Sequence, residues 1–286
     1  MCCPLCQEKR KIQLGLHTRE EFERWYKEAF QVDVSPFFST DTIQLCQCLE
    51  CKLIFFEPVR EADGLFYAAL AQHEWYYAKE KYEFEYAAQV VLRHQPRKVL
   101  EVGCGRGYFL DKIRYAAEVS GLEQNPQAVA ALKEKGIAVD LWESGEVFDL
   151  VVAFQVLEHV ANPQDFLETL LKKTVPGGHV LLTVPNPDSA YMREVFQYLD
   201  CPPHHLTRWP KAAFQWIAAK NQLEVEDFFD EPITLGHYEQ LLTARHRQLS
   251  TENQELAVNI CTTYPGKERP LGHTHGVLLR KLANEV

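Results

Sequence analysis

The 286-residue sequence lacks several features that would assign it to a particular class of protein. It contains no apolar run approaching the roughly 20 residues that a membrane-spanning helix needs, and no internal repeat or low-complexity tract. Its first residues, MCCPLCQEKR, include no apolar stretch of the kind that forms a signal peptide. We therefore expect a cytoplasmic protein without a membrane partner.

Positive charge is also scarce. The formal net charge is −10, the sequence pI is about 5.6, and no stretch is rich in Lys and Arg. A protein that follows a phosphate backbone normally presents a basic face, so a nucleic-acid partner is not expected. The 46% of hydrophobic residues is enough for a substantial core, in one large domain or a domain with an appendage.

Cysteine is present but unevenly distributed, with six of the nine cysteines in the first 51 residues. In a reducing compartment they favour free thiols or metal ligands over disulfides. Two Cys-x-x-Cys pairs, CPLC and CLEC, supply four candidate metal ligands: Cys3, Cys6, Cys48 and Cys51. Four thiolates close a tetrahedral site, so we expect a structural Zn²⁺ ion. Cys2 and Cys46 are adjacent alternatives, and the 41-residue spacer between the pairs is unusually long.

The position of these pairs predicts a small zinc-binding module over residues 1–60, followed by a separate domain over 72–286. Between the pairs, TREEFERWYKEAF predicts a helix, and DTIQL and KLIFF predict short strands. Residues 73–94 carry aromatic and apolar residues at helical spacing and predict a helix that ends near Pro96. Residues 231–268 show no clear pattern and are interpreted as an irregular insertion.

Strand and helix patterns alternate in the middle of the chain. KVLEV, EVSGLE, IAVDLW, FDLVVAF and HVLLTV predict strands, whereas GYFLDKIRYAA, NPQAVAALKEKG and PQDFLETLLKK predict helices. The unbroken apolar runs DLVVAF and HVLLTV are typical of strands that helices cover on both faces. After the predicted helix PKAAFQWIAAKN, the segments LEVEDFF and GVLLRKL would add two late strands. The pattern predicts an α/β protein with a doubly wound, mostly parallel sheet of seven strands.

A glycine-rich turn joins the first of these strands to the following helix. In VLEVGCGRGYFL, the residues Gly103, Gly105 and Gly107 would let a ligand lie against bare backbone at a helix N-terminus. A dinucleotide-binding fingerprint would require a small residue at position 108, where this chain has Tyr108. Glu123, at the end of the second strand, can accept hydrogen bonds from both hydroxyl groups of a ribose.

At these motifs the sequence resembles the class I S-adenosylmethionine-dependent methyltransferases. LEVGCGRGYFL matches the first motif of that family, VSGLEQNP its second-strand acid, FDLVVAFQVLEHVANP its fourth-strand motif and LKKTVPGGHVLLTVPNP the segment after it. The resemblance covers roughly residues 75–230 and implies a Rossmann-like sheet with S-adenosylmethionine as cofactor. An N-terminal zinc-knuckle module ahead of such a core resembles a subset that acts on sugars and natural-product intermediates.

The resemblance also implies which residues contact the cofactor. They are Glu101, Gly103, Gly105, Gly107, Glu123, Trp142, Gln155, Leu157 and, from the predicted helix 73–94, Tyr76. Glu101 would hold the ammonium group, Glu123 the ribose, and Gln155 with Leu157 would flank the sulfonium. Trp142 fits either a wall of the adenine site or ordinary core packing.

Three histidines are candidates for the catalytic residues. His159 follows the fourth strand in LEHV, at the edge where ligands bind in such sheets, and an imidazole suits proton removal from an acceptor. It could instead order this loop or cap the next helix. His204 and His205 follow two prolines in LDCPPHHLTRW, a segment that resembles the acceptor-side loop of related methyltransferases.

These features together predict a methyltransferase that transfers a methyl group to oxygen or carbon of a small-molecule acceptor, such as a sugar or a natural-product intermediate. Methyl transfer to a protein or an RNA is the first alternative, with the zinc module as the recognition element. A non-catalytic scaffold that binds S-adenosylmethionine is the second. The intact glycine loop, Glu123 and the LEHV segment favour an enzyme.

Overall fold

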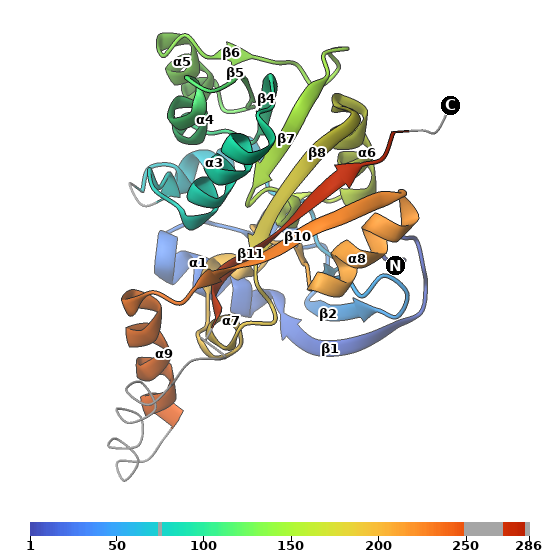
Figure 1. The fold of residues 1–286 in the computed structure, drawn as a ribbon. Coiled ribbons are helices and arrows are strands. Elements are labelled where there is room, and N and C mark those ends of the chain that lie inside the picture. The colour runs from blue at the N-terminus through green and yellow to red at the C-terminus, as the bar shows by residue number, and fades with distance from the viewer. Residues whose placement is uncertain (74–75, 249–270, 284–286) are drawn as a thin grey trace.

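The computed structural model describes residues 1–73, 76–248 and 271–283 (Figure 1). Its centre is a seven-stranded sheet in the order β10-β11-β8-β7-β4-β5-β6. The strands are β4 (Lys98–Val102), β5 (Glu118–Leu122), β6 (Ala138–Val139), β7 (Phe148–Phe154), β8 (Thr174–Pro185), β10 (Leu223–Pro232) and β11 (Leu271–Lys281). Strands β8, β7, β4, β5 and β6 are parallel. Strand β11 pairs antiparallel with both β8 and β10, so it alone runs in the opposite direction and β10 runs in the direction of the others. The predicted mostly parallel seven-stranded α/β sheet is confirmed.

Helices cover both faces of this sheet (Figure 1). They are α3 (Tyr82–His94), α4 (Tyr108–Ile113) and α5 (Pro126–Glu134) on one face, and α6 (Pro163–Lys173) and α8 (Lys211–Lys220) on the other. The unbroken apolar run DLVVAF forms strand β7, which has helices on both sides. Leu150 and Val152 pack against the α3, α4 and α5 face, whereas Val151 and Ala153 pack against the α6 and α8 face. Successive side chains point to opposite faces of a strand, so both sets must be apolar.

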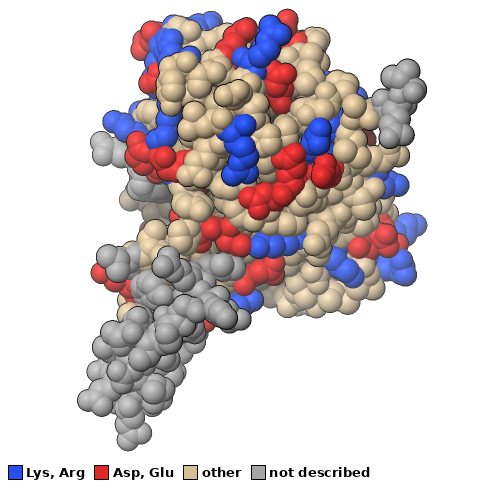
Figure 2. All heavy atoms as spheres, in the orientation of Figure 1, with Lys and Arg blue, Asp and Glu red and all other residues tan. Residues whose placement is uncertain are grey.

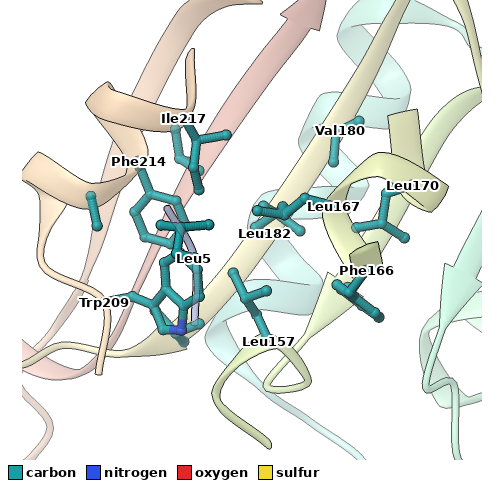
Figure 3. Packing of buried hydrophobic residues seen from close by; sticks show 14 of the residues in the cluster. Leu5, Leu157, Phe166, Leu167, Leu170, Val180, Leu182, Trp209, Phe214 and Ile217 are labelled. Atoms are coloured by element: carbon teal, nitrogen blue, oxygen red, sulfur yellow. The ribbon is translucent and has the colours of Figure 1, made fainter. Parts of the chain in front are cut away.

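The core on the α6 and α8 face also includes the N-terminal end of the chain. Figure 3 shows Leu5, from the first Cys-x-x-Cys loop, beside Trp209 and Phe214, with Leu157 lying between this group and the side chains of α6. Leu5, Trp209 and Phe214 are all less than 4% exposed. The cysteine-containing segment therefore packs directly on the main sheet.

The first part of the chain forms a second, antiparallel sheet of four strands in the order β1-β2-β3-β9. Its elements are β1 (Lys11–Thr18), α1 (Arg19–Phe30), η1 (Ser35–Phe37), β2 (Thr42–Cys48), β3 (Ile54–Glu57), α2 (Gly64–Leu70) and β9 (Thr207–Arg208). Strand β9 comes from much later in the sequence and pairs with β3 through Phe55 and Thr207. This pairing holds the histidine segment before β9 against the N-terminal sheet.

Two local features differ from the sequence predictions. Strand β1 was not expected from the sequence. In KIQLGLHT, Ile12, Leu14 and Leu16 occupy every second position, but these apolar residues are exposed rather than buried. The helix expected over residues 73–94 begins only at Tyr82, after Lys81, whose backbone is extended (φ −140°, ψ 147°). The residues just before it cross the carboxyl edge of the sheet instead.

The remaining elements are α7 (Ala190–Glu194), η4 (Tyr198–Asp200) and α9 (Leu235–Gln248), which projects away from the sheet in Figure 1. Helix α9 occupies the first part of the segment predicted to be an irregular insertion, and residues 249–268 of that segment lie outside the described residues. Among the described helices, none has the length and apolarity to cross a membrane.

Candidate active site

The glycine loop lies at the carboxyl edge of the sheet, between β4 and α4. The Gly103 amide donates to the carbonyl of Leu122 at the end of β5 (2.8 Å), which joins the loop to the neighbouring strand. Gly103 and Gly107 have φ values of +72° and +71°, a region that side chains disfavour. A Cβ atom at Gly103 would lie 2.6 Å from Val156, and one at Gly107 would lie 2.5 Å from Leu132. Both positions therefore require glycine.

Glu123 holds this loop from the next strand. Its Oε2 accepts from the Gly105 amide (2.7 Å), and its Oε1 accepts from the Gln124 and Asn125 amides (2.7 and 2.8 Å). The carboxylate is thus fixed beside the loop and only partly buried. Each carboxylate oxygen can accept more than one hydrogen bond, so this group can also receive hydroxyl donors from a ligand.

Glu101 lies on β4 beneath the loop and is 3% exposed. Its Oε2 atom is buried and has no hydrogen-bond partner among the described residues. Burial raises the pKa of this carboxyl well above its usual 4.5, an effect that nearby Lys81 opposes. A buried polar atom without a partner is costly, so this position fits a site that a cationic ligand group completes.

Two adjacent tyrosines contact different parts of the site, one the glycine loop and the other the histidines. The ring of Tyr77 covers the glycine loop, because a Cβ atom at Gly105 would lie 3.0 Å from it, and the Tyr77 hydroxyl lies 3.3 Å from the Asn125 side-chain amide. The hydroxyl of Tyr76, which the resemblance assigned to the cofactor, lies 3.3 Å from Nε2 of His204. Tyr77 is therefore the residue on the loop, and Tyr76 faces the histidines.

Three other expected cofactor contacts follow the sheet edge. Gln155 comes directly after β7 with a φ of +54°, unusual for a residue with a side chain and frequent where function requires strain. Leu157, in η3 (Leu157–His159), is 1% exposed and packs into the core. The Trp142 ring stacks on Phe166 of α6, with 5.6 Å between the ring centroids. This contact corresponds to core packing, one of the two alternatives for Trp142. Nearby Asp140 pairs with Lys173 (2.6 Å).

The structure brings the three candidate histidines together. The ring centroids of His159 lie 4.4 Å from those of His204 and 4.8 Å from those of His205, and the latter two rings stack at 4.6 Å. His159 comes from η3, whereas His204 and His205 come from the segment that β9 holds in place. One nitrogen of each ring lies within 4.8 Å of one nitrogen of the others.

Hydrogen bonds to Nδ1 define the orientation of each imidazole. Nδ1 of His159 lies 2.6 Å from the carbonyl of His204, and Nδ1 of His204 lies 3.0 Å from the carbonyl of Leu199. A carbonyl only accepts, so both Nδ1 atoms carry the proton and both Nε2 atoms carry a lone pair. Nδ1 of His205 lies 3.2 Å from the carboxylate of Asp200, which also pairs with Arg208 at 2.8 Å.

Burial makes this histidine cluster uncharged near neutral pH. It lowers the pKa of His159 to about 4 and the pKa values of His204 and His205 well below 6.5. Burial also raises the pKa of Glu158 to about 8. Glu158 is fully buried, neither of its oxygens has a hydrogen-bond partner among the described residues, and Oε1 lies 3.9 Å from Nε2 of His205.

The four predicted metal ligands also meet. Sγ of Cys3 lies 3.5 Å from Sγ of Cys51, Sγ of Cys6 lies 3.4 Å from Sγ of Cys48, and all four sulfur atoms lie within 4.8 Å of one another. The hydrogen bond with Cys51 lowers the pKa of the Cys3 thiol to about 6. The alternative ligand Cys46 points elsewhere, with its Sγ 3.7 Å from Oε1 of Glu57.

Comparison with known proteins places this geometry in a family. The sequence profile described as "Methyltransferase domain" matches residues 51–227, which is more than half of the chain. The chain belongs to the methyltransferase family. The expected enzyme class, an S-adenosylmethionine-dependent methyltransferase, is confirmed.

Individual relatives of this methyltransferase share parts of the chain. The ubiquinone biosynthesis O-methyltransferase of Pectobacterium atrosepticum is 30% identical over 191 residues, which cover 59% of this chain and 73% of the relative. The protein of the same name from Pectobacterium carotovorum is 36% identical over 104 residues, which cover 32% of this chain and 44% of the relative. The chain thus spans less than half of this second relative. The crystal structure of coclaurine N-methyltransferase, bound to N-methylheliamine and SAH, is 15% identical, with coverage of 70% and 72% and a TM-score of 0.47.

Sequence reasoning missed some residues of this methyltransferase site. Glu158 stands beside His159 in the LEHV segment, but only its burial reveals a carboxyl without partners. Asp200, which orients His205, and Tyr67, whose ring lies 5.8 Å from that of His159, have no local motif. The one usable signal was Glu158 itself, because an acidic residue directly after a buried strand lies at the ligand-binding edge.

Proposed function

We propose that this methyltransferase transfers the methyl group of S-adenosylmethionine to a hydroxyl oxygen of an uncharged small molecule. The observation that carries the proposal is the neutral histidine cluster at the carboxyl edge of the sheet, where His159 follows Val156, the residue that lies against Gly103. Its His159 has a hydrogen-bonded Nδ1 and a lone pair on Nε2. The names of the ubiquinone biosynthesis O-methyltransferases, which match part of the chain, support oxygen as the acceptor atom.

The cofactor half of the site would use five features of the chain. The buried Oε2 of Glu101, which lacks a partner, would receive the ammonium group, and the bare backbone at Gly103 and Gly105 would accept the amino-acid part. Glu123 would bind the ribose hydroxyls. Gln155 would lie near the sulfonium, where its strained backbone turns the chain away from β7. Tyr77 would cover the bound cofactor, because its ring already lies on the loop.

S-adenosylmethionine supplies a methyl carbon that the sulfonium already activates. The main task of the protein is therefore to align the acceptor oxygen with that carbon. His159 would accept the hydroxyl proton at Nε2 during transfer. Its pKa of about 4 keeps Nε2 unprotonated at neutral pH, but it also makes the imidazole a weak base. Proton removal would therefore accompany methyl transfer rather than precede it, which suits acidic hydroxyl groups such as phenols.

The surroundings of His159 favour an uncharged, aromatic acceptor. The rings of Tyr67 and Tyr76 face the histidines, with centroid distances of 5.8 Å to His159 and 6.0 Å to His204. Burial raises the pKa values of both tyrosines, so neither ionises near neutral pH. A cluster of neutral aromatic side chains binds planar apolar groups well and a desolvated charge poorly.

Surface charge supports a small acceptor over a nucleic acid. On the face shown in Figure 2, Lys and Arg side chains alternate with Asp and Glu side chains and form no continuous basic area. The formal net charge of −10 adds a general repulsion for a phosphate backbone.

The second part of the proposal is a structural zinc ion at the cysteine cluster. Zn–S bonds of ~2.3 Å in a tetrahedron place neighbouring sulfur atoms about 3.8 Å apart. The sulfur distances of 3.4 and 3.5 Å are close to this value and far longer than a disulfide bond. Cys3 and Cys6 lie in one loop, whereas Cys48 ends β2 and Cys51 lies in the turn after it. The ion would thus fasten the N-terminal loop to the second sheet, with no open position for a reacting group.

The test is methyl transfer from radiolabelled S-adenosylmethionine to a simple phenol. An aniline and a benzene analogue without the hydroxyl group, both of similar size, are tested as alternative acceptors. We expect a methyl ether from the phenol and little product from the analogues. His159→Gln should lower kcat about 10²–10⁴-fold while the affinity for S-adenosylmethionine changes little. His17→Gln, which replaces a histidine on β1, is the matched control.

Two results would contradict the proposal. Methyl transfer to nitrogen or carbon in place of oxygen would contradict the proposal that a hydroxyl group is the acceptor. A normal kcat in His159→Gln, with the phenol methylated at oxygen, would leave the reaction but remove His159 as its base.

A further inference from the structure

A second group of histidines lies at the opposite end of the main sheet from the glycine loop. His94 is the last residue of α3, His179 lies in the first half of β8, and Glu226 lies on β10. The three elements can be followed in Figure 1. Neither the cofactor site nor the acceptor site uses these residues.

Their side chains converge on a common point. Nε2 of His179 lies 3.0 Å from Oε1 of Glu226, and Nε2 of His94 lies 3.5 Å from Oε2 of the same carboxylate. The two imidazole centroids are 4.3 Å apart, and one ligand atom from each residue lies within 4.8 Å of the others. In a tetrahedral site with bonds of about 2.0–2.1 Å, neighbouring ligand atoms are about 3.4 Å apart, so the two nitrogen–oxygen distances already suit one ion.

Two further observations favour a ligand at this point. Nε2 of His94 is buried and has no hydrogen-bond partner among the described residues, so one donor or acceptor position is unfilled. Glu226 is the extra residue of a β-bulge: its neighbours Val225 and Asp227 pair with the consecutive residues Leu279 and Leu278 of β11. A bulge redirects a side chain and is frequent beside functional sites, and here it turns Glu226 toward the histidines.

The electrostatics also suit a cation. The carbonyl groups at the end of α3 give His94 a partly negative environment. The carboxylate of Glu226 adds a negative charge beside both imidazoles. Imidazole nitrogens coordinate metals in their neutral form.

We propose that His94, His179 and Glu226 bind a divalent transition-metal ion such as Zn²⁺, at a site separate from the cysteine cluster. Two imidazole nitrogens and one carboxylate oxygen are the ligand types that Zn²⁺ accepts. Three protein ligands leave one coordination position open. A depression of about 360 Å³, lined by His94, His179 and residues around Pro176, lies beside the cluster and gives that position access to water.

Metal binding at this site requires a change of tautomer at His179. In the metal-free protein, Nε2 of His179 donates its proton to Oε1 of Glu226 (3.0 Å). When the metal takes Nε2, the single proton of the neutral imidazole moves to Nδ1, and the carboxylate of Glu226 binds the ion in place of that proton. The ion would connect α3, β8 and β10 and should raise the melting temperature of the full chain.

The experiment is calorimetric titration of the purified full-length protein with Zn²⁺, after its tightly bound zinc has been measured. We expect about one additional equivalent of Zn²⁺ per chain. The double variant His94→Ala/His179→Ala should lose this equivalent, and Glu226→Gln should weaken it at least about 10-fold. Glu224→Gln, two residues away on β10, is the matched control, because Glu224 pairs with Arg280 outside the cluster.

The outcomes separate the alternatives. Absence of an additional equivalent in the unmodified protein overturns the proposal, and the three residues then form an ion pair only. An additional equivalent that survives in the double variant also overturns it, because the metal then binds elsewhere, for example at the histidines beside the acceptor site. Glu226→Gln keeps both imidazoles, so it tests the site even if the double variant is too unstable to titrate.

Discussion

Replacing Glu158 by glutamine tests the idea that this residue is a buried, protonated carboxyl beside the histidine cluster. Glu158 is fully buried, and neither oxygen has a partner among the described residues. Burial raises its pKa from 4.5 to about 8. Glutamine has the same shape and stays neutral at every pH. The substitution therefore removes only the cost of ionising this group inside the protein.

The size and sign of the effect follow from the pKa shift. Below pH 4.5 the carboxyl is protonated in both the folded and the unfolded chain, so Glu158→Gln changes stability little. Between pH 4.5 and 8 only the folded chain keeps the proton, so the stability of the unmodified protein falls as pH rises. The difference grows by about 1.4 kcal/mol per pH unit, to about 3 kcal/mol at pH 7 and about 5 kcal/mol above pH 8.

The assay is urea denaturation of both proteins at pH 5.5, 7 and 8.5, with the metal content held constant because bound metal also shifts stability. We expect Glu158→Gln to be the more stable protein, with an advantage that increases at each step. Histidines of the unfolded chain also titrate in this range, but they do so in both proteins, and their contribution largely cancels in the difference. Glu168→Gln, on the exposed face of α6, is the control and should show no such trend.

A difference that is independent of pH would refute the reasoning. So would a variant that is less stable than the unmodified protein at pH 8.5, because Glu158 would then be an ionised group with a partner. In either case the description of the acceptor site as uncharged would have to be abandoned.

Two further predictions concern the cofactor and the cysteine cluster. Glu101→Gln should weaken S-adenosylmethionine binding about 10- to 150-fold, because it removes one charge-assisted hydrogen bond of about 1.5–3 kcal/mol. The control Glu146→Gln, at an exposed position, should not weaken binding. Calorimetry measures both, and equal affinities would remove Glu101 from the site. Cys48→Ser should lower the zinc that co-purifies with the protein and its melting temperature, whereas Cys46→Ser should change the zinc content little. Elemental analysis decides, and full zinc in Cys48→Ser would contradict a four-thiolate ion.

Much of the main sheet could be predicted because its signals are local. Apart from Asp149, every residue of the run FDLVVAF is apolar, so both faces of the strand are apolar. The run forms β7 between two layers of helices. Asn125, Pro126 and Gly136 mark the two ends of α5, where the Asn125 side chain caps the Gln127 amide (2.9 Å). These features depend on backbone geometry within a few residues, which the sequence states directly.

Predictions failed where long-range packing overrides local preference. The aromatic stripe before Tyr82 has helical spacing, yet Tyr77 lies on the glycine loop and Tyr76 beside His204. Strand β1 pairs with β2, although its apolar residues Ile12, Leu14 and Leu16 face outward and bury little surface. A local pattern contains no information about the partner that such a segment meets in the folded chain.

The sequence by itself determined the glycine loop, the acidic residues that end β4 and β5, and the two Cys-x-x-Cys pairs, because each is a short motif with a backbone or ligand requirement of its own. Only the tertiary structure decided that His159 meets His204 and His205, that Glu158 is buried without a partner, and that Glu226 reaches His94. These residues lie far apart in the chain or depend on complete burial. Their protonation and ligand-binding properties arise from the sum of all surrounding atoms, which is fixed only when the chain has folded.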